Sequence, residues 1–414
     1  MQAAHIALRR RARQAAGASR PRHLRLGCIS AAQLSAVSLL WGTISMLRRT
    51  LFVGAAAMAS VLAVAAAPAS AQIKIGSAGP MTGEYASFGK QLQDGAQQAV
   101  ADINAKGGVL GKKLVLEIGD DACDPKQAVS VANKFADDGV KFVAGHFCSS
   151  SSIPASKVYT EEGILQITPA STNPKFTDEG AWNTFRTCGR DDQQGEVAGH
   201  TIATEYKDRK VAILQDNTTY GKGIADETKK FMNAAGKKEA MYQAYVPGES
   251  DYTALVSRLK EAGINLVYFG GYHKEIGQIV KQAAQQGLKA TYLGPDSLVT
   301  KEFWQISGPA GEGVMMTFPA DPRNLPTAKA VVDEFKKKGI DPEGYVLYTY
   351  AAVQVWAEAA TKAKTVDPKK VAAELKSGGP WPTVLGNISY NKKGDVTKAN
   401  YVWYIWHDGN YHQM

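Results

Sequence analysis

Acidic residues are missing from the first 71 positions of the chain. These positions contain nine of the 48 basic residues, all of them arginine, and none of the 39 acidic residues. The rest of the chain therefore holds equal numbers of both signs, and the formal net charge of +9 comes from the leader alone. This excludes the overall charge as an argument for a nucleic-acid-binding surface, and we expect no nucleic-acid partner.

Residues 46–71 have the three parts of a secretory signal peptide. A pair of arginines at 48 and 49 precedes an apolar run over 51–67, and Ala69-Ser70-Ala71 forms a small-residue cleavage pattern before Gln72. The alternative is a membrane anchor, for which the run is at the short limit. We expect cleavage near Ala71 and export to the periplasm.

Residues 1–45 match neither a signal peptide nor a folded domain. They are rich in Arg and Ala, and Met46 is a better start than Met1 for a chain whose signal begins at that point. We expect either an over-long translation start or a disordered basic tail.

The sequence also lacks the motifs of common enzymes, cofactor sites and metal sites. It contains no G-x-S-x-G, no phosphate-loop lysine motif, no H-E-x-x-H and no C-x-x-C. The glycines at 107, 108 and 111 precede a Lys-rich strand, whereas a dinucleotide fingerprint requires a helix there. We therefore expect no catalytic residue, no cofactor and no metal.

Cysteine is scarce, and Cys28 belongs to the leader. In an oxidising compartment two of the other three, Cys123, Cys148 and Cys188, can pair. Cys123 follows the second predicted strand and Cys148 the third, so adjacent parallel strands would bring them within bridging distance. The alternative is a thiol nucleophile, Cys148 beside His146 or Cys188, in an exported enzyme that acts on amides.

Short apolar strands alternate with amphipathic helices after residue 71. Strands are predicted at 73–79, 113–118, 140–144, 164–167, 210–214, 240–246, 265–269 and 291–293. Their apolar runs are continuous, as is typical of strands covered on both faces. The two successive arrays predict an α/β fold with two doubly wound lobes. There is no long Pro/Gly/Ser linker, so short crossings predict a hinge.

The last part of the chain has a different pattern. Residues 326–338 and 347–364 are predicted to be helices. Strands are predicted at 387–391 and 401–407, and the second is followed by an Asp-Gly turn.

Small polar residues follow two neighbouring strands of the first array. Ser149–Ser152 come after the strand at 140–144 and begin a helix, and an N-cap would need only one serine. Hydroxyls and backbone N–H groups at a helix start predict a site for an anion such as a carboxylate. Thr168–Thr172 follow the strand at 164–167 and are expected at the same edge.

Tyr220, Tyr272 and Asp296 follow strands of the second array. Asp296 would face a cationic group in a ligand site, although a turn or a helix cap is the commoner role of Asp after Gly-Pro. For the two tyrosines, packing is the commoner role. The residues alone leave both interpretations open.

Four blocks of sequence together identify a relative: D-D-A-C-D-P-K-Q-A-V at 120–129, G-H-F-C-S-S-S at 145–151, G-I-L-Q-I-T-P-A-S-T at 163–172 and G-G-Y-H at 270–273. In this order and spacing they resemble the leucine/isoleucine/valine-binding proteins, the periplasmic solute-binding components of ABC transporters. The resemblance extends over residues 72–414.

This resemblance implies the type I periplasmic binding protein fold, a Venus flytrap whose lobes are joined by a three-crossing hinge. It implies a first lobe of residues 72–190 plus 320–399 and a second of residues 191–319 plus 400–414. It also implies that Cys123 and Cys148 form the family's disulfide.

The resemblance assigns the carboxylate end of a ligand site to the first lobe. Ser149, Ala170 and Thr172 would bind the α-carboxylate of an amino acid through hydroxyl and backbone groups. Ser171 stands where alanine is frequent and would add a hydroxyl at this end.

The resemblance assigns the other end of the ligand to Tyr272 and Asp296, which would bind the α-ammonium group. Phe88 and Tyr220 would form the walls of the side-chain pocket. Relatives usually have Glu in place of Asp296, and often Tyr or Trp in place of Phe88. These differences leave the side chain of the ligand open.

The expected function is that of a monomeric periplasmic receptor in an ABC importer. It would capture a zwitterionic amino acid, above all leucine, isoleucine or valine, and its closed form would dock on a membrane permease. The alternative is the ligand-binding component of an amino-acid or amide sensing system.

Overall fold

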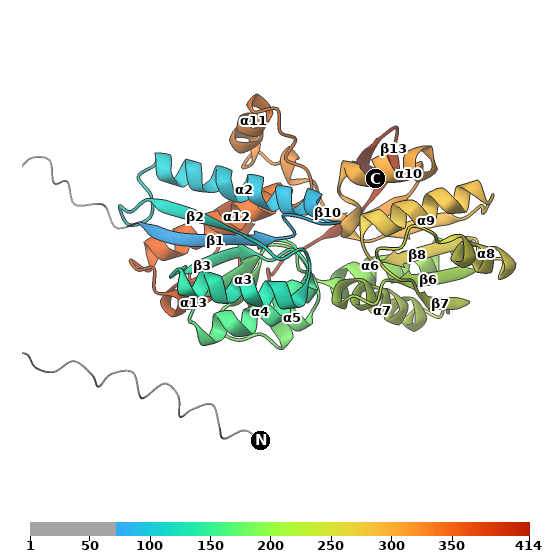
Figure 1. Cartoon of the computed structure of the whole chain (residues 1–414), viewed down its shortest axis with the longest axis horizontal. Helices are drawn as coiled ribbons and strands as arrows, with labels where there is room; N and C mark the ends of the chain where they lie inside the picture. The colour runs from blue at the N-terminus through green and yellow to red at the C-terminus, as the bar shows by residue number, and fades with distance from the viewer. Residues whose placement is uncertain (1–71) are drawn as a thin grey trace, which may run out of the picture. The chain divides into compact units, whose positions relative to one another are not determined.

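A computed structural model describes residues 72–414 of the chain (Figure 1). The predicted leader at 1–45 and the predicted signal peptide at 46–71 lie outside the described residues. Within the described part, the strands form two main sheets and one small one. None of the helices described is both long enough and apolar enough to span a lipid bilayer.

The first sheet has five parallel strands in the order β2-β1-β3-β4-β5. They are β1 (Ile73–Gly79), β2 (Leu114–Asp120), β3 (Phe142–Gly145), β4 (Leu165–Thr168) and β5 (Thr184–Arg186). Because all five run in the same direction, their C-terminal ends lie at one edge, where loops from different strands meet.

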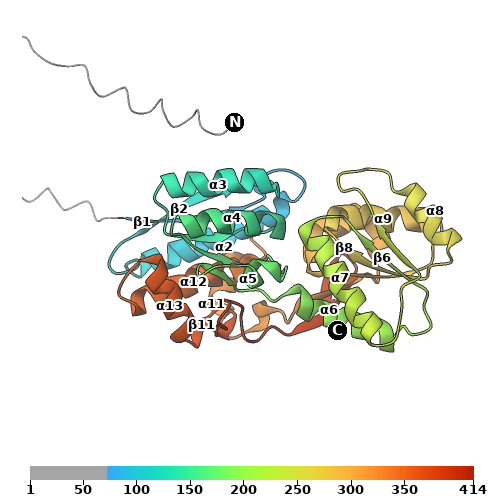
Figure 2. The ribbon, with the colours of Figure 1, turned by 90° about the horizontal axis from the view of Figure 1, so that it is seen from below.

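Helices cover both faces of this sheet (Figures 1 and 2). They include α2 (Ala86–Ala105), α3 (Pro125–Asp137), α4 (Ser149–Glu161), α12 (Val346–Lys362) and α13 (Pro368–Ser377). Phe142 and Ala144 pack with residues of α2 and α12, whereas Val143 packs with residues of α3 and α4. Both faces of β3 are thus apolar, which explains its continuous apolar run.

The second sheet has seven strands in the order β14-β13-β10-β9-β8-β6-β7. They are β6 (Val211–Gln215), β7 (Met241–Ala244), β8 (Leu266–Gly270), β9 (Thr291–Gly294), β10 (Met315–Pro319), β13 (Tyr401–His407) and β14 (Asn410–Gln413). The pairs from β7 to β10 are parallel, whereas β13 pairs antiparallel with β10 and β14. The C-terminal hairpin therefore extends the second sheet.

The helices of the second sheet begin with α6, which precedes β6, and the others follow its strands in turn. They are α6 (Asp191–Thr204), α7 (Thr219–Ala234), α8 (Thr253–Glu261), α9 (His273–Gln285), the 3-10 turn η1 (Asp296–Leu298) and α10 (Lys301–Ser307). The remaining elements include α5 (Lys175–Asp178), α11 (Lys329–Lys337) and the small sheet of β11 (Trp381–Thr383) and β12 (Gly386–Ile388).

The chain passes three times between the two main sheets: after β5, after β10 and before β13. This arrangement confirms the expected α/β class with two doubly wound lobes and a three-crossing hinge. The residue boundaries given above for the two lobes stay a prediction.

Several elements were not predicted from the sequence, and α6 shows why. Its sequence is polar and glycine-rich, without a clear apolar stripe. The glycines serve close packing on α7, because a Cβ at Gly199 would lie 2.6 Å from the backbone nitrogen of Met232. β5, β10, α10 and α13 were also missed, and β5 contains a fully buried arginine, Arg186.

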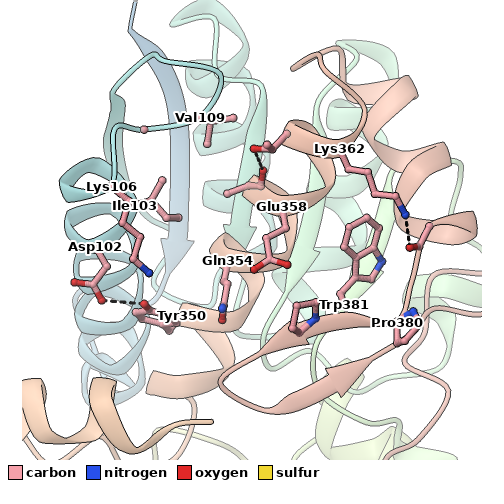
Figure 3. A pocket seen from close by; sticks show the side chains of 15 residues that line it. Asp102, Ile103, Lys106, Val109, Tyr350, Gln354, Glu358, Lys362, Pro380 and Trp381 are labelled. Carbon is pink, nitrogen blue, oxygen red and sulfur yellow. Dashed lines mark hydrogen bonds between the residues drawn. The ribbon is translucent and has the colours of Figure 1, made fainter.

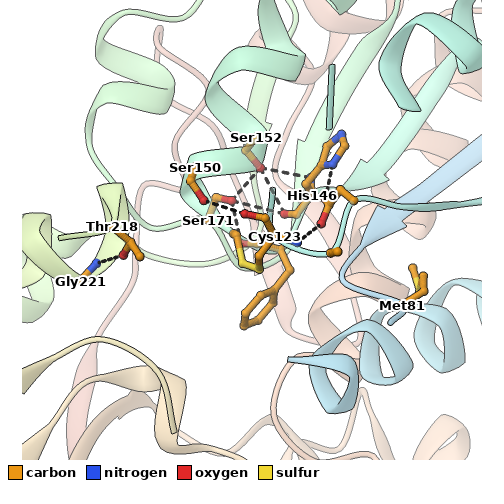
Figure 4. Close-up of a disulfide and its surroundings, with 12 residues drawn as sticks. Met81, Cys123, His146, Ser150, Ser152, Ser171, Thr218 and Gly221 are labelled. Atoms are coloured by element: carbon orange, nitrogen blue, oxygen red, sulfur yellow. Dashed lines mark hydrogen bonds and ion pairs between the residues drawn. A yellow bond between two sulfur atoms is a disulfide. The ribbon is translucent and has the colours of Figure 1, made fainter. Parts of the chain in front are cut away.

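Cys123 and Cys148 form a disulfide with a Cα–Cα distance of 5.6 Å (Figure 4). The expectation that this pairing results from adjacent strands was wrong, because β2 and β3 are not neighbours and β1 lies between them. The loop after β2 instead crosses the end of β1, where the N–H of Asp121 donates to the carbonyl of Gly79 at 3.0 Å. The disulfide thus connects the two strands that flank β1.

We expect replacement of Cys123 and Cys148 by serine to lower the free energy of unfolding of the mature chain. The disulfide closes a loop with a sequence separation of 25, for which chain entropy predicts a loss of about 3–4 kcal/mol. Urea denaturation measures it. A loss below about 1 kcal/mol would show that the loop is ordered without the bridge.

Candidate ligand-binding site

A small cavity lies where loops after strands of the two main sheets meet. Its empty volume is about 210 Å³. The lining residues are Phe147, Ser149, Ala170, Tyr220, Tyr272, Asp296, Ser297 and Tyr345. The cavity thus combines loops that follow β3, β4, β6, β8 and β9 with the residue that precedes α12. This edge is where open α/β sheets bind ligands.

The wall formed by the first sheet is suited to an anion. Ser149 is the first residue of α4 and is 1% exposed. β3 and β4 are paired in parallel, which brings Ser149 and Ala170 to the same wall. The first N–H groups of a helix lack intrahelical partners and carry the positive end of its dipole. Together with the serine hydroxyl they can bind a carboxylate.

Ser171 and Thr172, both predicted to contact a ligand, do not line the cavity. The Ser171 hydroxyl lies 2.6 Å from the Ser152 hydroxyl and donates to the Phe147 carbonyl at 2.8 Å (Figure 4). Its hydrogen bonds are therefore made within the protein. The Thr172 hydroxyl is buried without a partner among the described residues. The ligand role of both stays a prediction.

Asp296 occupies the opposite wall, at the start of η1. One carboxylate oxygen accepts a hydrogen bond from the Tyr220 hydroxyl and the other from the Tyr345 hydroxyl, at 2.7 Å for Tyr345. Burial raises the pKa of Asp296, which is 2% exposed. Hydroxyl donors stabilise the ionised form but supply no positive charge, so this wall is suited to a cationic group.

Aromatic rings line much of the space between these two walls. The ring of Tyr272 lies 5.1 Å from that of Tyr220 and 6.2 Å from that of Phe147, measured between centroids. Phe147 and Tyr345 are 5.4 Å apart and edge-on. An apolar ligand side chain would contact ring faces and edges here.

Phe88 does not line this cavity. It is fully buried and stacks on Phe147 at 4.3 Å, so Phe147 takes the position at the cavity wall. Phe147 and Tyr345 were not predicted as site residues. Phe147 stands in the G-H-F-C block, whereas no local pattern indicates Tyr345. Tyr345 immediately precedes α12, which packs on the first sheet, so only the tertiary fold brings it to Asp296.

The two sides of the cavity are in contact around its mouth. Lys274 forms an ion pair with Glu84, and the Asn173 side-chain amide donates to the Thr219 carbonyl at 2.8 Å. The rings of Tyr85 and Tyr272 lie 4.3 Å apart. These contacts join loops of the first sheet to loops of the second, and they describe a closed cleft.

The cysteines give no support to thiol chemistry. The Cys148 sulfur is in the disulfide, and Cys188 is buried, which raises its pKa and opposes the thiolate form. His146 is also fully buried and lies within hydrogen-bonding distance of Asp121, at 2.5 Å, and of Tyr159, at 2.9 Å. This histidine is part of the support beneath the serine loop.

A larger cavity, with an empty volume of about 1110 Å³, lies elsewhere on the first sheet (Figure 3). It is bounded by the C-terminal end of α2, by α12 and by the segment that leads into β11, with Trp381 and Glu358 in its wall. The Tyr350 hydroxyl donates to Asp102 there at 2.8 Å. None of the residues predicted to bind a ligand lines it.

Comparison with known proteins agrees with the fold. Residues 72–409 match a family model described as periplasmic binding protein. The chain belongs to the periplasmic binding protein family. The resemblance expected from the four sequence blocks is therefore confirmed, and the two-lobed α/β architecture is that of its type I members.

Curated relatives match this chain along most of its length. Leu/Ile/Val-binding protein homolog 1 of Brucella suis is 51% identical over 363 residues, which cover 88% of this chain and 97% of the relative. The leucine-, isoleucine-, valine-, threonine-, and alanine-binding protein of Pseudomonas aeruginosa is 47% identical over 336 residues, covering 81% and 90%.

Solved structures of similar proteins share this fold. The leucine binding protein LivK from Thermotoga maritima has a TM-score of 0.77 and 27% identity, with 83% of this chain and 97% of that chain covered. LivJ from Streptococcus pneumoniae, solved in complex with isoleucine, has a TM-score of 0.76 and 25% identity, with 83% and 99% covered.

We expect Phe88→Ala to destabilise the protein, because it removes a fully buried ring from beneath Phe147. Truncation of a buried phenylalanine costs about 3–5 kcal/mol of unfolding free energy. Urea denaturation without ligand measures the loss. A change below about 1 kcal/mol would show that neighbouring rings fill the space.

Proposed function

We propose that this protein is the solute-binding component of an ABC importer and captures a zwitterionic amino acid, with leucine, isoleucine and valine as the leading ligands. The names of the relatives from Brucella and Pseudomonas support this ligand class. The mature protein would act in the periplasm as a monomer after cleavage near Ala71, and its closed form would dock on a membrane permease.

One observation carries the proposal: the two walls of one small cavity are complementary to the two charges of an amino acid. The start of α4, with Ser149, faces the cavity from one side. Asp296, a buried carboxylate whose partners in residues 72–414 include no cation, faces it from the other. A ligand with a carboxylate and an ammonium group satisfies both walls, whereas a ligand that lacks one group leaves a wall unpaired.

In this proposal, closure of the two lobes strengthens the contacts between protein and ligand. Contacts such as Asn173 with Thr219 shut the mouth of the cavity, which removes water and strengthens each hydrogen bond to the ligand. The ligand shifts the population toward the closed form because it contacts both lobes at once. The permease then recognises the closed shape, as in other hinged receptors.

The moving bodies in this proposal are residues 72–190 plus 320–399 and residues 191–319 plus 400–414. The rings of Phe147, Tyr220, Tyr272 and Tyr345 form walls suited to an aliphatic side chain. Asp296 is shorter by one methylene than the glutamate expected at this place, so the ammonium group would sit deeper or bond through a water.

We expect Asp296→Ala to weaken the binding of leucine, isoleucine and valine, measured by titration calorimetry. The loss of the only acid among the described residues that line the cavity strands the ammonium group and should cost about 2–5 kcal/mol, or roughly 30-fold or more in Kd. The matched control is Asp226→Asn on α7, an exposed acid paired with Lys222. Equal affinities in wild type and Asp296→Ala would refute the role of Asp296.

We expect the affinity for these amino acids to fall as pH is lowered from 8 to 4. Burial raises the pKa of Asp296 in the empty site, whereas the ammonium group of a ligand favours the ionised form. Ligand binding therefore lowers the pKa of this carboxyl and releases a proton wherever the empty site is protonated, so acidification favours the empty state.

Calorimetry in buffers of different ionisation enthalpy measures this proton release. Asp296→Asn is the control, because an amide does not titrate and should bind weakly with a flatter pH profile. Equal slopes in wild type and in this variant would assign the pH dependence to another group.

A further inference from the structure

Both walls of the cavity are held by one stretch of chain, the first crossing from β5 into α6. Its residues Arg186 and Gln194 are both fully buried. Neither lines the cavity, but each makes hydrogen bonds to a segment that does.

Arg186 holds the loop that carries Ala170. Its guanidinium donates to the carbonyls of Ser171 at 2.7 Å and Asn173 at 3.2 Å, and to the Thr177 hydroxyl at 2.9 Å. Its Nε lies 2.8 Å from an oxygen of Asp395, which compensates the buried charge. The planar fork of arginine fixes several acceptors at once, so this loop has a defined position after β4.

Gln194 holds the opposite wall. Its Oε1 accepts the backbone N–H of Asp296 at 2.9 Å and the Thr317 hydroxyl at 2.6 Å. Between the two side chains, the N–H of Asp191 donates to the Thr172 carbonyl at 2.9 Å. The crossing therefore contacts the segments of both walls over a short length of backbone.

We propose that Arg186 and Gln194 are positioning residues that set the distance between the carboxylate-binding wall and the ammonium-binding wall. This inference rests on the proposed function. A ligand with charges at a fixed separation binds well only when both walls are held within a fraction of an ångström. Because both residues belong to a hinge crossing, the spacing is defined at the hinge itself.

Hydrogen exchange of the ligand-free protein, followed by mass spectrometry, tests directly whether Arg186 and Gln194 fix the positions of these two segments. Arg186→Lys keeps the charge near Asp395 but loses the fork, so exchange should rise in peptides that cover 169–174. Gln194→Leu removes the acceptor of the Asp296 N–H, so exchange should rise in peptides that cover 294–298. Neither variant should raise exchange in α13.

The chain offers a matched control for each variant. Thr177→Val removes one partner of Arg186, together with the bonds of this hydroxyl to Asp395 and Arg190, and leaves both carbonyl contacts of Arg186. Thr317→Val removes the second partner of the Gln194 oxygen and leaves its bond to Asp296. Both controls lose a buried hydrogen bond, as the test variants do, so they reveal how much of any effect is general destabilisation.

Calorimetry with leucine, isoleucine and valine tests the consequence for binding. Each test variant should weaken binding by about tenfold or more and each control by less than about threefold, at temperatures equally far below each Tm. Leucinamide, which lacks the carboxylate, and 4-methylpentanoate, which lacks the ammonium group, are then used as competitors. Arg186→Lys should spare leucinamide, and Gln194→Leu should spare 4-methylpentanoate.

The outcomes separate the inference from the proposed function. Unchanged exchange at both segments, or a rise throughout the protein, overturns the positioning roles. A local rise with control-like affinity for the amino acids overturns them too. If the wild type binds none of the three amino acids, the proposed function fails, and the expected effect on binding fails with it. The exchange data then still decide whether Arg186 and Gln194 fix the two segments.

Discussion

Burial of an acid without a cation is the constraint on which the site depends. Asp296 is almost fully buried, and its carboxylate oxygens are met by two tyrosine hydroxyls. Hydroxyls lower the cost of this burial but leave a net negative charge in a low-dielectric space. A positive group entering the cavity removes that imbalance. The same physics makes the opposite wall, a helix start with serine, selective for negative charge.

The parallel strands decide where this constraint can be met. In both main sheets the strand ends deliver polar loops to one edge, so residues as distant in sequence as Ser149 and Asp296 come to line one small space. The helices behind the strands keep these loops in place through apolar packing on both faces. The two ends of the cavity are thus lined by polar loops, whereas the packing that holds these loops in place is apolar.

Much of this architecture could be predicted from the sequence, because buried parallel strands give continuous apolar runs. β1 and β13 have the predicted bounds, and Asp124 caps α3 through the N–H groups of Lys126 and Gln127 as its position before Pro125 predicts. What was missed depends on tertiary contacts. β5 carries a buried arginine that only its partners compensate, and Tyr345 reaches Asp296 only across the cleft between the two sheets.

The bond from Tyr345 to Asp296 has a further consequence for how the receptor behaves when unloaded. Tyr345 immediately precedes α12, which packs on the first sheet, whereas Asp296 follows β9 of the second. The Tyr345 hydroxyl therefore bonds across the cleft to the carboxylate that would otherwise bind the ammonium group of a ligand. A receptor that closes without ligand would present the closed shape to its transporter, and this phenol–carboxylate bond is one of several contacts across the cleft that favour such closure.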